Sequence, residues 1–350
     1  MYNGYKIVVN TAAGRRRYMQ YLIPFVVACD IVDRYDIWVN THDGADIEFF
    51  RRIADRFPKV NLVWQPDGIV DGIKSINAFY KSCVDADTIY FKMDDDIVWI
   101  EPGAIEEMVR FRVDNPNYFL VSPLVINNAL STYLLQVCDK LHLYAYQNSS
   151  ANHNLLWKSG EFASQLHRWF IDNYLATGRW AELHVGTHPM AMTRFSINAV
   201  LWFGSEMAKF GGIVPGDDEE FLSCIYPSRM GMANCWNGDA IFAHFAFFTQ
   251  RKQLDADDIL PTYGRLLHAQ WANDSRMSAI DTDVQSIMKQ IADRAVELGN
   301  TPSPYRRPDV SKTKSRINEF KMSIYRTSPD LFRLLSRIRH GKSDTNYIQQ

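Results

Sequence analysis

The segment YFKMDDDIVWIEPG, at residues 90–103, joins an apolar run, three consecutive aspartates and a second apolar run. The first run belongs to a β-rich stretch and predicts a buried strand that leads directly to Asp94, Asp95 and Asp96. Ligands of open α/β sheets bind beyond the carboxyl ends of the strands, so the aspartates occupy the position of a binding site. Adjacent carboxylates repel one another unless a cation or solvent compensates their charge. The segment therefore predicts a central strand followed by a metal-binding turn.

The aspartate run has more than one interpretation. Asp94 and Asp96, two residues apart, can converge on one divalent ion and its bound diphosphate. A solvated acidic turn that caps the helix predicted after Pro102 would need no metal. An EF-hand calcium loop is excluded because Trp99 occupies the sixth loop position, where glycine is required. We favour the metal site because the run follows a buried strand and other candidate groups accompany it.

Strands and helices alternate on the amino-terminal side of the aspartates. Strand patterns occupy residues 6–10, 35–40, 60–64 and 88–92, and helix patterns occupy residues 18–29, 46–57 and 73–83. This alternation favours an α/β fold with a mostly parallel, doubly wound central sheet.

The carboxyl-terminal side is less regular. The sequence predicts a helix over residues 101–113 and strands over residues 118–122 and 241–248. The aromatic residues of the hard-to-assign stretch 136–183 suggest a partly helical lid or acceptor platform, and they include Trp157, Trp169, Phe170 and Trp180. After residue 270 the sequence predicts a helix over residues 282–298, which is followed by three prolines and a basic tail. We therefore expect a catalytic domain at residues 1–270 and a helical extension at residues 271–350.

The composition limits the class of protein. The chain is 47% hydrophobic and 13% aromatic, which suits a large folded core. Its net charge is only -2, but residues 304–342 hold eleven Lys or Arg against three Asp or Glu. A basic tail on an acidic body is not typical of a dedicated nucleic-acid binder, so we expect no nucleic-acid partner.

The cysteines and the apolar segments indicate a location. Five scattered cysteines without a CxxC pair predict reduced, mostly buried thiols. Residues 1–6 lack the apolar region of a secretion signal. The apolar run 19–29 is much shorter than the roughly 20 residues that a spanning helix needs. We expect a soluble cytoplasmic protein, associated at most with the inner face of the membrane.

A second acidic motif, IVPGDDEEFLSCIYP, lies at residues 213–227. Asp217 is a plausible cap for the helix that follows, with Glu219 and Glu220 as solvated residues of its first turn. Four successive acids exceed what capping requires, however. A carboxylate beside an acceptor hydroxyl can act as a general base. One acid of this motif is therefore a catalytic candidate.

Two further segments complete the set of candidates. His244, within GDAIFAHFAFF, is either a satisfied core residue or a ligand for Mn²⁺, which accepts imidazole. The loop TAAGRRRYM, at residues 11–19, follows the first strand. Gly14 permits a close approach of the backbone, and the arginines at 15–17 offer positive charge to a diphosphate or nucleotide. The loop lacks the Walker lysine pattern and GxGxxG, so its signal is weak alone.

Taken together, these segments resemble the GT-A-type, DxD-containing inverting glycosyltransferases. KMDDDIVWI is similar to the DxD segment of β-1,3-galactosyltransferase and fringe-like enzymes, with related bacterial glycosyltransferases. GDDEEFL resembles the motif that supplies the base of inverting members, and His244 corresponds to a carboxyl-terminal metal ligand. The resemblance spans about residues 6–251 and implies a GT-A, Rossmann-like nucleotide-sugar-binding domain.

The resemblance also implies roles for single residues. It assigns Mn²⁺ or Mg²⁺ to Asp96, Asp94 and His244, and it assigns the nucleotide to Thr11, Arg15, Asp94 and Asp95. Asp218 corresponds to the catalytic base, although Glu219 follows at once and is the alternative. Asn127 and Asn128 correspond, more loosely, to the acceptor side.

The implied reaction moves a sugar from a nucleotide-sugar, first of all a UDP-sugar, to a hydroxyl of a glycan or lipid-linked acceptor. Such a reaction belongs to polysaccharide biosynthesis. A retaining mechanism would need no base. A sugar nucleotidyltransferase is an alternative, but TAAGRRRYM lacks the lysine that its signature usually carries. A non-catalytic glycan-binding module that uses Trp157, Trp169 and Trp180 is another.

The basic tail contains one amphipathic pattern. Ser328, Pro329 and Asp330 predict a helix start. The apolar residues that follow at helical spacing are Leu331, Leu334, Leu335 and Ile338. The helix would either lie on an anionic membrane surface as a peripheral anchor or pack on the catalytic domain or on a second subunit of an oligomer.

Overall fold

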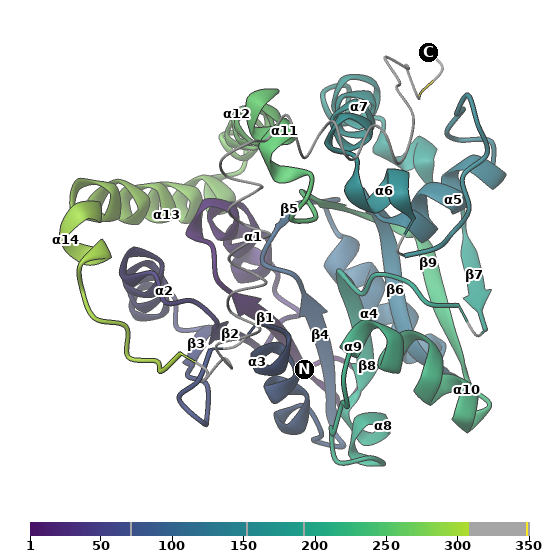
Figure 1. Cartoon of the computed structure of the whole chain (residues 1–350), viewed down its shortest axis with the longest axis horizontal. Helices are drawn as coiled ribbons and strands as arrows, with labels where there is room; N and C mark the ends of the chain where they lie inside the picture. Colours follow the sequence, from purple (N-terminus) through teal and green to yellow (C-terminus); the bar gives the residue numbers. More distant parts are fainter. Residues whose placement is uncertain (71, 152, 192, 308–347, 349–350) are drawn as a thin grey trace, which may run out of the picture.

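The computed structural model of the chain (Figure 1) describes residues 1–70, 72–151, 153–191, 193–307 and 348. Within these residues the strands form one nine-stranded sheet, in the order β3-β2-β1-β4-β8-β6-β9-β5, and β7 pairs with β9. The bounds of the strands are β1 (Lys6–Ala13), β2 (Arg34–Val39), β3 (Val60–Val63), β4 (Thr88–Met93), β5 (Ile97–Ile100), β6 (Tyr118–Ile126), β7 (Thr187–Met190), β8 (Ala199–Phe203) and β9 (Ala233–His244).

The sheet has a parallel half and a mixed half. β1 pairs in parallel with β2 and β4, and β2 pairs in parallel with β3. β8 runs antiparallel between β4 and β6, while β9 is parallel to β6 and antiparallel to β5 and β7. The predicted α/β fold with a mostly parallel central sheet is confirmed. Its parallel half consists of the four strands predicted before the aspartates.

Apolar side chains cover both faces of the sheet. Along β1, Ile7 and Val9 belong to one buried cluster and Val8 to the other, as the alternation of a strand requires. The helices that contribute to the cluster of Ile7 include α1 (Arg16–Ala28), α2 (Gly44–Arg56), α4 (Ala104–Asp114) and α13 (Ser275–Asp293). The helices that contribute to the cluster of Val8 include α5 (Ala129–Val137), α7 (Gly160–Phe170) and α12 (Ile259–Trp271).

The helices predicted before residue 114 begin within about a turn of the observed ones, whereas the helix predicted over residues 282–298 begins earlier, at Ser275, and divides into α13 and α14 (Ala295–Gly299). The helix predicted over residues 73–83 divides into α3 (Gly72–Ala78) and a 3₁₀ turn (Phe79–Ser82). The stretch 136–183 is partly helical, as expected. The remaining helical segments are α6 (Asn154–Lys158), a π-helical turn (Ile171–Leu175), a 3₁₀ turn (Trp180–Leu183), α8 (Gly204–Ala208), α9 (Asp218–Glu220), a second π-helical turn (Phe221–Ile225), α10 (Tyr226–Met230) and α11 (Arg251–Ala256).

The late strand differs from its predicted bounds of 241–248. β9 begins earlier, at Ala233, and ends at His244. Its first half carries polar residues, and the pairing with β6 shifts after Asn237, so that the ladder resumes only at Ile241. Gly238 lies in this bulge, where a Cβ atom would come within 2.6 Å of the carbonyl oxygen of Gly186. Because the first half of β9 is polar and contains the bulge, the apolar pattern of the sequence did not show where the strand begins.

The segment after residue 270 packs on the sheet domain. Ile280, Val284, Ile287 and Ile291 recur at helical spacing along α13 and join the same apolar cluster as α1 and α2. The boundary predicted near residue 270 falls inside α12 (Ile259–Trp271). The division into two domains stays a prediction, and the amphipathic pattern at residues 328–338 lies outside the described residues. In the part of the chain that is described, no helix has the length and apolarity needed to cross a membrane.

A buried histidine links α7, α12 and the end of β9. His167 has no exposed surface, and its two ring nitrogens lie 2.9 Å from the Tyr263 hydroxyl and 2.8 Å from the carbonyl oxygen of Phe245. Burial disfavours the charged imidazolium and lowers the pKa of His167 from 6.5 to about 4. The folded protein therefore binds the proton of this side chain more weakly than the unfolded chain does.

This difference predicts a loss of stability in acid. Because the folded-state pKa is depressed, the stability present above pH 6.5 should decline as the pH falls toward 4, by up to about 3 kcal/mol. Denaturant unfolding of the wild type and of His167→Gln at pH 7.5 and pH 5 measures the effect. The variant should lose less stability on acidification. A matched His142→Gln variant, whose side chain is 59% exposed, should behave like the wild type.

Candidate active site

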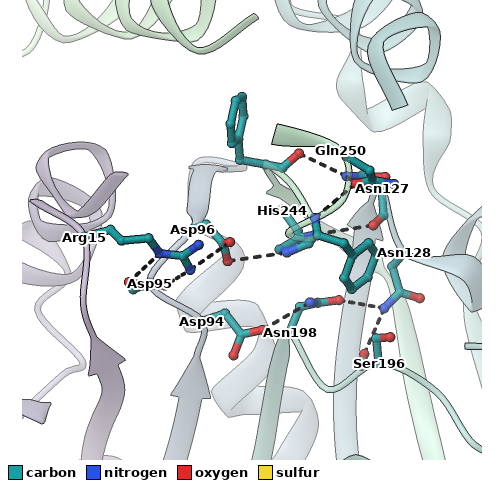
Figure 2. Close-up of polar contacts among 12 residues, drawn as sticks. Arg15, Asp94, Asp95, Asp96, Asn127, Asn128, Ser196, Asn198, His244 and Gln250 are labelled. Atoms are coloured by element: carbon teal, nitrogen blue, oxygen red, sulfur yellow. Dashed lines mark hydrogen bonds and ion pairs between the residues drawn. The ribbon is translucent and has the colours of Figure 1, made fainter. Parts of the chain in front are cut away.

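The three aspartates form the turn between β4 and β5, and the neighbouring strands hold its backbone. The amide of Asp94 donates to the carbonyl oxygen of Asn198 at 2.8 Å, just before β8. The amide of Phe245 donates to the carbonyl oxygen of Asp96 at 2.8 Å, because Ile97 of β5 pairs with His244 of β9. The turn is therefore fixed from both sides, and it lies at the carboxyl end of β4, as predicted (Figure 2).

Asp94, Asp96 and His244 converge at this turn. Each residue offers one ligand atom, and these atoms all lie within 4.8 Å of one another. His244 is buried, with Nε2 3.4 Å from Asp96 Oδ1 and Nδ1 3.4 Å from the carbonyl oxygen of Asn127. A proton on Nδ1 leaves the lone pair of Nε2 for a ligand. Two carboxylates and one imidazole suit Mn²⁺ and, less closely, Mg²⁺, so the group could hold a metal ion.

Asp96 divides its two oxygens between two kinds of partner. Oδ1 faces His244, while Oδ2 accepts from Arg15 Nη2 at 2.9 Å and lies 3.8 Å from Arg251 Nη2. Burial alone would raise the pKa of Asp96, but Arg15 and then His244 outweigh it and hold the pKa well below the usual range. Asp96 is therefore ionised and has one oxygen directed toward the predicted metal ligands.

Asp95 has a different environment. It accepts from the Gly14 amide at 2.9 Å and from Arg15 Nε at 3.0 Å, and the guanidinium of Arg15 makes a second contact with it. A Cβ atom on Gly14 would lie 3.1 Å from the carbonyl oxygen of Asn40, so a glycine suits this close approach. Asp95 thus fastens the loop after β1 to the turn. The nucleotide contact predicted for Asp95 stays a prediction.

A buried lysine connects Asp94 with the second acidic motif. Lys92 Nζ donates to Asp94 and, at 2.7 Å, to the carbonyl oxygen of Ile197. Burial opposes its charge, but the carboxylates of Asp94 and Asp218 outweigh burial and raise the pKa of Lys92. Asp218 accepts from the Tyr80 hydroxyl at 2.9 Å. Asp218 therefore lies in the same electrostatic cluster as the aspartate turn.

The other acids of this motif have structural partners. Asp217 caps α9 by accepting from the Glu220 amide at 2.9 Å, which confirms the capping role. Glu219 is not solvated as expected, because its side chain is only 21% exposed and accepts from Arg194 Nε at 3.1 Å. Glu220 is 51% exposed and lies 3.8 Å from Arg194. Arg194 Nη2 also lies 3.2 Å from Asp217 Oδ2, so Arg194 holds these three acids together, while Asp218 is turned toward Tyr80.

Asparagines connect Asp94 with α5. Asn198 Nδ2 donates to Asp94 Oδ2 at 3.1 Å, and its Oδ1 accepts from Asn128 Nδ2 at 2.8 Å. Asn128 also caps α5 by accepting from the amides of Leu130 and Ser131. Lys92, Asn198 and Arg251 were not predicted as site residues. The signal in the sequence was present only for Lys92, which shares the strand that leads to the aspartates.

Some predicted residues contact buried neighbours in the core. Thr11 is fully buried in β1, and its hydroxyl accepts from Tyr35 at 3.0 Å, so its predicted contact with a nucleotide stays a prediction. Phe170 and Trp180 pack on the buried Trp99, with ring centroids 5.3 and 5.6 Å away. Only Trp157 of the predicted aromatic platform joins the rings beside His244, through Phe247.

Comparisons with known proteins give no family. No protein-family model and no curated protein matches the chain. Among solved structures it is similar to CMP:2-keto-3-deoxy-manno-octonic acid synthetase complexed with CTP, at 9% identity and a TM-score of 0.38, over 74% of this chain and 99% of that one. It is also similar to 4-diphosphocytidyl-2C-methyl-D-erythritol synthase from Anaerococcus prevotii, at 9% identity and a TM-score of 0.37, over 75% and 97%. Likeness at this level does not indicate what the chain binds.

Because Asp95 connects the loop after β1 to the aspartate turn, replacing it should destabilise the protein. Asp95→Ala should lower the free energy of unfolding by about 2 kcal/mol, because it leaves Nε of the half-buried Arg15 and the Gly14 amide without their acceptor. Asp255→Ala removes the partner of the exposed Arg17 and should change stability by less than about 1 kcal/mol. Urea denaturation compares the two variants. Equal effects would refute the fastening role.

Proposed function

We propose that this protein is a metal-dependent glycosyltransferase that moves a sugar from a nucleotide-sugar, first of all a UDP-sugar, to an acceptor hydroxyl with inversion. The convergence of Asp94, Asp96 and His244 at the carboxyl end of β4 carries the proposal. The site combines these candidate metal ligands with cationic side chains and with a separate, half-buried carboxylate, Asp218. Sugar transfer from a nucleotide diphosphate needs all three kinds of group.

The charges of the site support a diphosphate ligand. The three aspartates of the turn face three cations, Lys92, Arg15 and Arg251, so these side chains compensate one another. A divalent cation adds two positive charges, which an incoming diphosphate would balance. Among the described residues, Arg15 Nη1 and Arg251 Nε have no hydrogen-bond partner, so each guanidinium group has one donor that a phosphate oxygen could accept from. When bound to Asp94, Asp96 and His244, the metal would neutralise negative charge on the leaving diphosphate.

Asp218 is the proposed base. Burial raises its pKa despite the opposing effects of Lys92 and Tyr80, which makes the ionised carboxylate a better proton acceptor. In the reaction the acceptor hydroxyl would give its proton to Asp218 as its oxygen bonds to the anomeric carbon. The bond between that carbon and the diphosphate oxygen breaks, and the diphosphate leaves with the electron pair. Glu219 is the less suitable base because Arg194 already engages it.

A sugar nucleotidyltransferase is the second candidate. The arginine pair favours it, because Arg15 and Arg251 lie on the same side of Asp96 and could face a triphosphate as well as a diphosphate. The two functions differ in their products. A nucleotidyltransferase joins a nucleoside triphosphate to a sugar phosphate and releases pyrophosphate, whereas a glycosyltransferase releases the nucleoside diphosphate.

One assay separates them. The full chain is incubated with Mn²⁺ or Mg²⁺ and either a panel of nucleotide-sugars or nucleoside triphosphates with sugar 1-phosphates. Slow, metal-dependent release of a nucleoside diphosphate from one nucleotide-sugar supports the proposal. Release of pyrophosphate with formation of a nucleotide-sugar supports the alternative. Inactivity in both arms, with the metal bound, would remove transfer as the function.

The metal ligands predict a binding defect that does not depend on activity. Asp96→Asn and His244→Ala should each weaken Mn²⁺ binding by at least about tenfold, since each removes one of three ligands. Calorimetric titration with Mn²⁺ measures the affinity, and circular dichroism checks the fold. Glu220→Gln, in the neighbouring acidic motif, is the control and should bind Mn²⁺ normally. Wild-type affinity in both ligand variants would refute the site.

The base predicts a different pattern. Asp218→Asn should keep the affinity for the donor but lower the rate of transfer by at least about 10²-fold, the lower range for general-base catalysis. Glu219→Gln should have a much smaller effect on the rate. Steady-state kinetics with donor and acceptor varied separately distinguishes binding from chemistry. A product that retains the anomeric configuration would show that no base is needed at this position.

A further inference from the structure

A row of aromatic rings leads from His244 to the surface. The ring of Phe247 lies 4.7 Å from the ring of His244, measured between centroids. Trp157, on α6, lies 6.2 Å from Phe247 and 5.3 Å from Phe248. Phe248 is 62% exposed, while Phe247 and Trp157 are half-buried. We refer to Trp157, Phe247 and Phe248 as the aromatic shelf.

A buried glutamine holds the shelf in place. Gln250 has no exposed surface, and its Oε1 accepts from the Phe247 amide at 3.0 Å and from Asn127 Nδ2 at 2.9 Å. Its Nε2 donates to the carbonyl oxygen of Leu156, beside Trp157, at 2.9 Å. The figure shows Gln250 and Asn127 together on the side of His244 opposite Arg15 (Figure 2).

A further hydrogen bond connects the loop after β9 with α6, the two segments that carry the rings. The hydroxyl of Thr249 donates to the carbonyl oxygen of Trp157 at 2.8 Å. The loop after β9 and α6 are therefore fixed to each other, and the rings are ordered before any ligand arrives. An aromatic side chain that is held in position yet left in water forgoes the stabilisation of burial. Ordered, exposed aromatic rings beside a polar site are typical of ligand binding.

We propose that the aromatic shelf binds a sugar ring of the acceptor, so that the acceptor is a glycoside. This inference rests on the proposed function, because the acceptor must meet the donor beside the metal. One face of a pyranose carries mainly C–H groups and packs on an aromatic ring, while its hydroxyls point outward to polar groups. The flanking residues of α6 are polar and exposed, with Lys158 donating to Asn154 at 2.7 Å.

The size of the shelf favours a sugar over a lipid chain. Within the shelf, successive ring centroids lie 6.2 and 5.3 Å apart, so the shelf matches one or two sugar rings. A long alkyl or polyprenyl chain would need a continuous apolar groove, whereas Asn154 and Lys158 border this surface with an amide and a charge. The ring of the acceptor that stacks here would place a neighbouring hydroxyl toward His244.

The test uses the full chain, Mn²⁺ and the nucleotide-sugar that the wild type hydrolyses. A panel of methyl glycosides of common hexoses and of farnesyl phosphate supplies acceptors with and without a sugar ring. Phe248→Ala should lower kcat/KM for the best glycoside by about tenfold or more, mainly through KM. Phe248→Tyr, which keeps the ring, should have a kcat/KM close to that of the wild type. Tyr144→Ala removes an equally exposed ring, also 62%, from another surface and serves as the matched control.

The outcomes are distinct. Unchanged glycoside kinetics in Phe248→Ala, or transfer to farnesyl phosphate but to no glycoside, would overturn the proposal. Donor hydrolysis without acceptor should be equal in the wild type and Phe248→Ala, which shows that donor binding is intact. If the wild type hydrolyses no donor, the proposed function fails first. Saturation-transfer NMR with the same methyl glycosides then tests the shelf separately. Glycoside binding by the wild type that is lost in Phe248→Ala would support the shelf, and no glycoside binding by the wild type would refute it.

Discussion

The buried carboxylate of Asp96 is the group on which the site and much of the surrounding fold depend. A charge at this depth is unfavourable unless partners compensate it, and the partners come from distant parts of the chain. Arg15 follows β1, His244 ends β9, and Arg251 begins α11. The first strand, the last strand and the helix after it must all be in place before Asp96 can be buried as an anion. The site is therefore assembled by the fold as a whole and not by one local motif.

The antiparallel strands explain why the turn is so well fixed. In a purely parallel sheet the residues after β4 would form a free loop. Here the carbonyl oxygen of Asn198, next to β8, accepts from the amide of Asp94 on one side. The antiparallel pairing of β5 with β9 places Ile97 beside His244 on the other side. β8, which is inserted between β4 and β6, and β5, which is added at the edge of the sheet beside β9, thus hold the turn in one position, and this suits groups that must converge on a small ion.

The sequence was sufficient for the features that depend on local patterns. The parallel strands, α1, α2 and α4 follow from periodicity, and the strand before Asp94 follows from its apolar run. The features that escaped depend on tertiary contacts. The first half of β9 is polar and contains a bulge, and β5 is only four residues long, so the start of β9 and the whole of β5 were not predicted. Asn198 is 104 positions from Asp94, and no pattern links them. The solvated role expected for Glu219 is wrong for the same reason, because its partner Arg194 lies in another segment.

The two sides of His244 differ in chemistry, and this difference suggests where the donor and the acceptor of the proposed reaction would bind. Arg15 and Arg251 lie on the side of Asp96, where a phosphate group is the natural ligand. Gln250 and Asn127 lie on the opposite side, where they hold the aromatic shelf (Figure 2). A donor bound through its diphosphate and an acceptor stacked on the rings would therefore approach from opposite sides. Displacement at an anomeric carbon with inversion requires this arrangement, because the incoming and leaving oxygens must lie on opposite faces of that carbon.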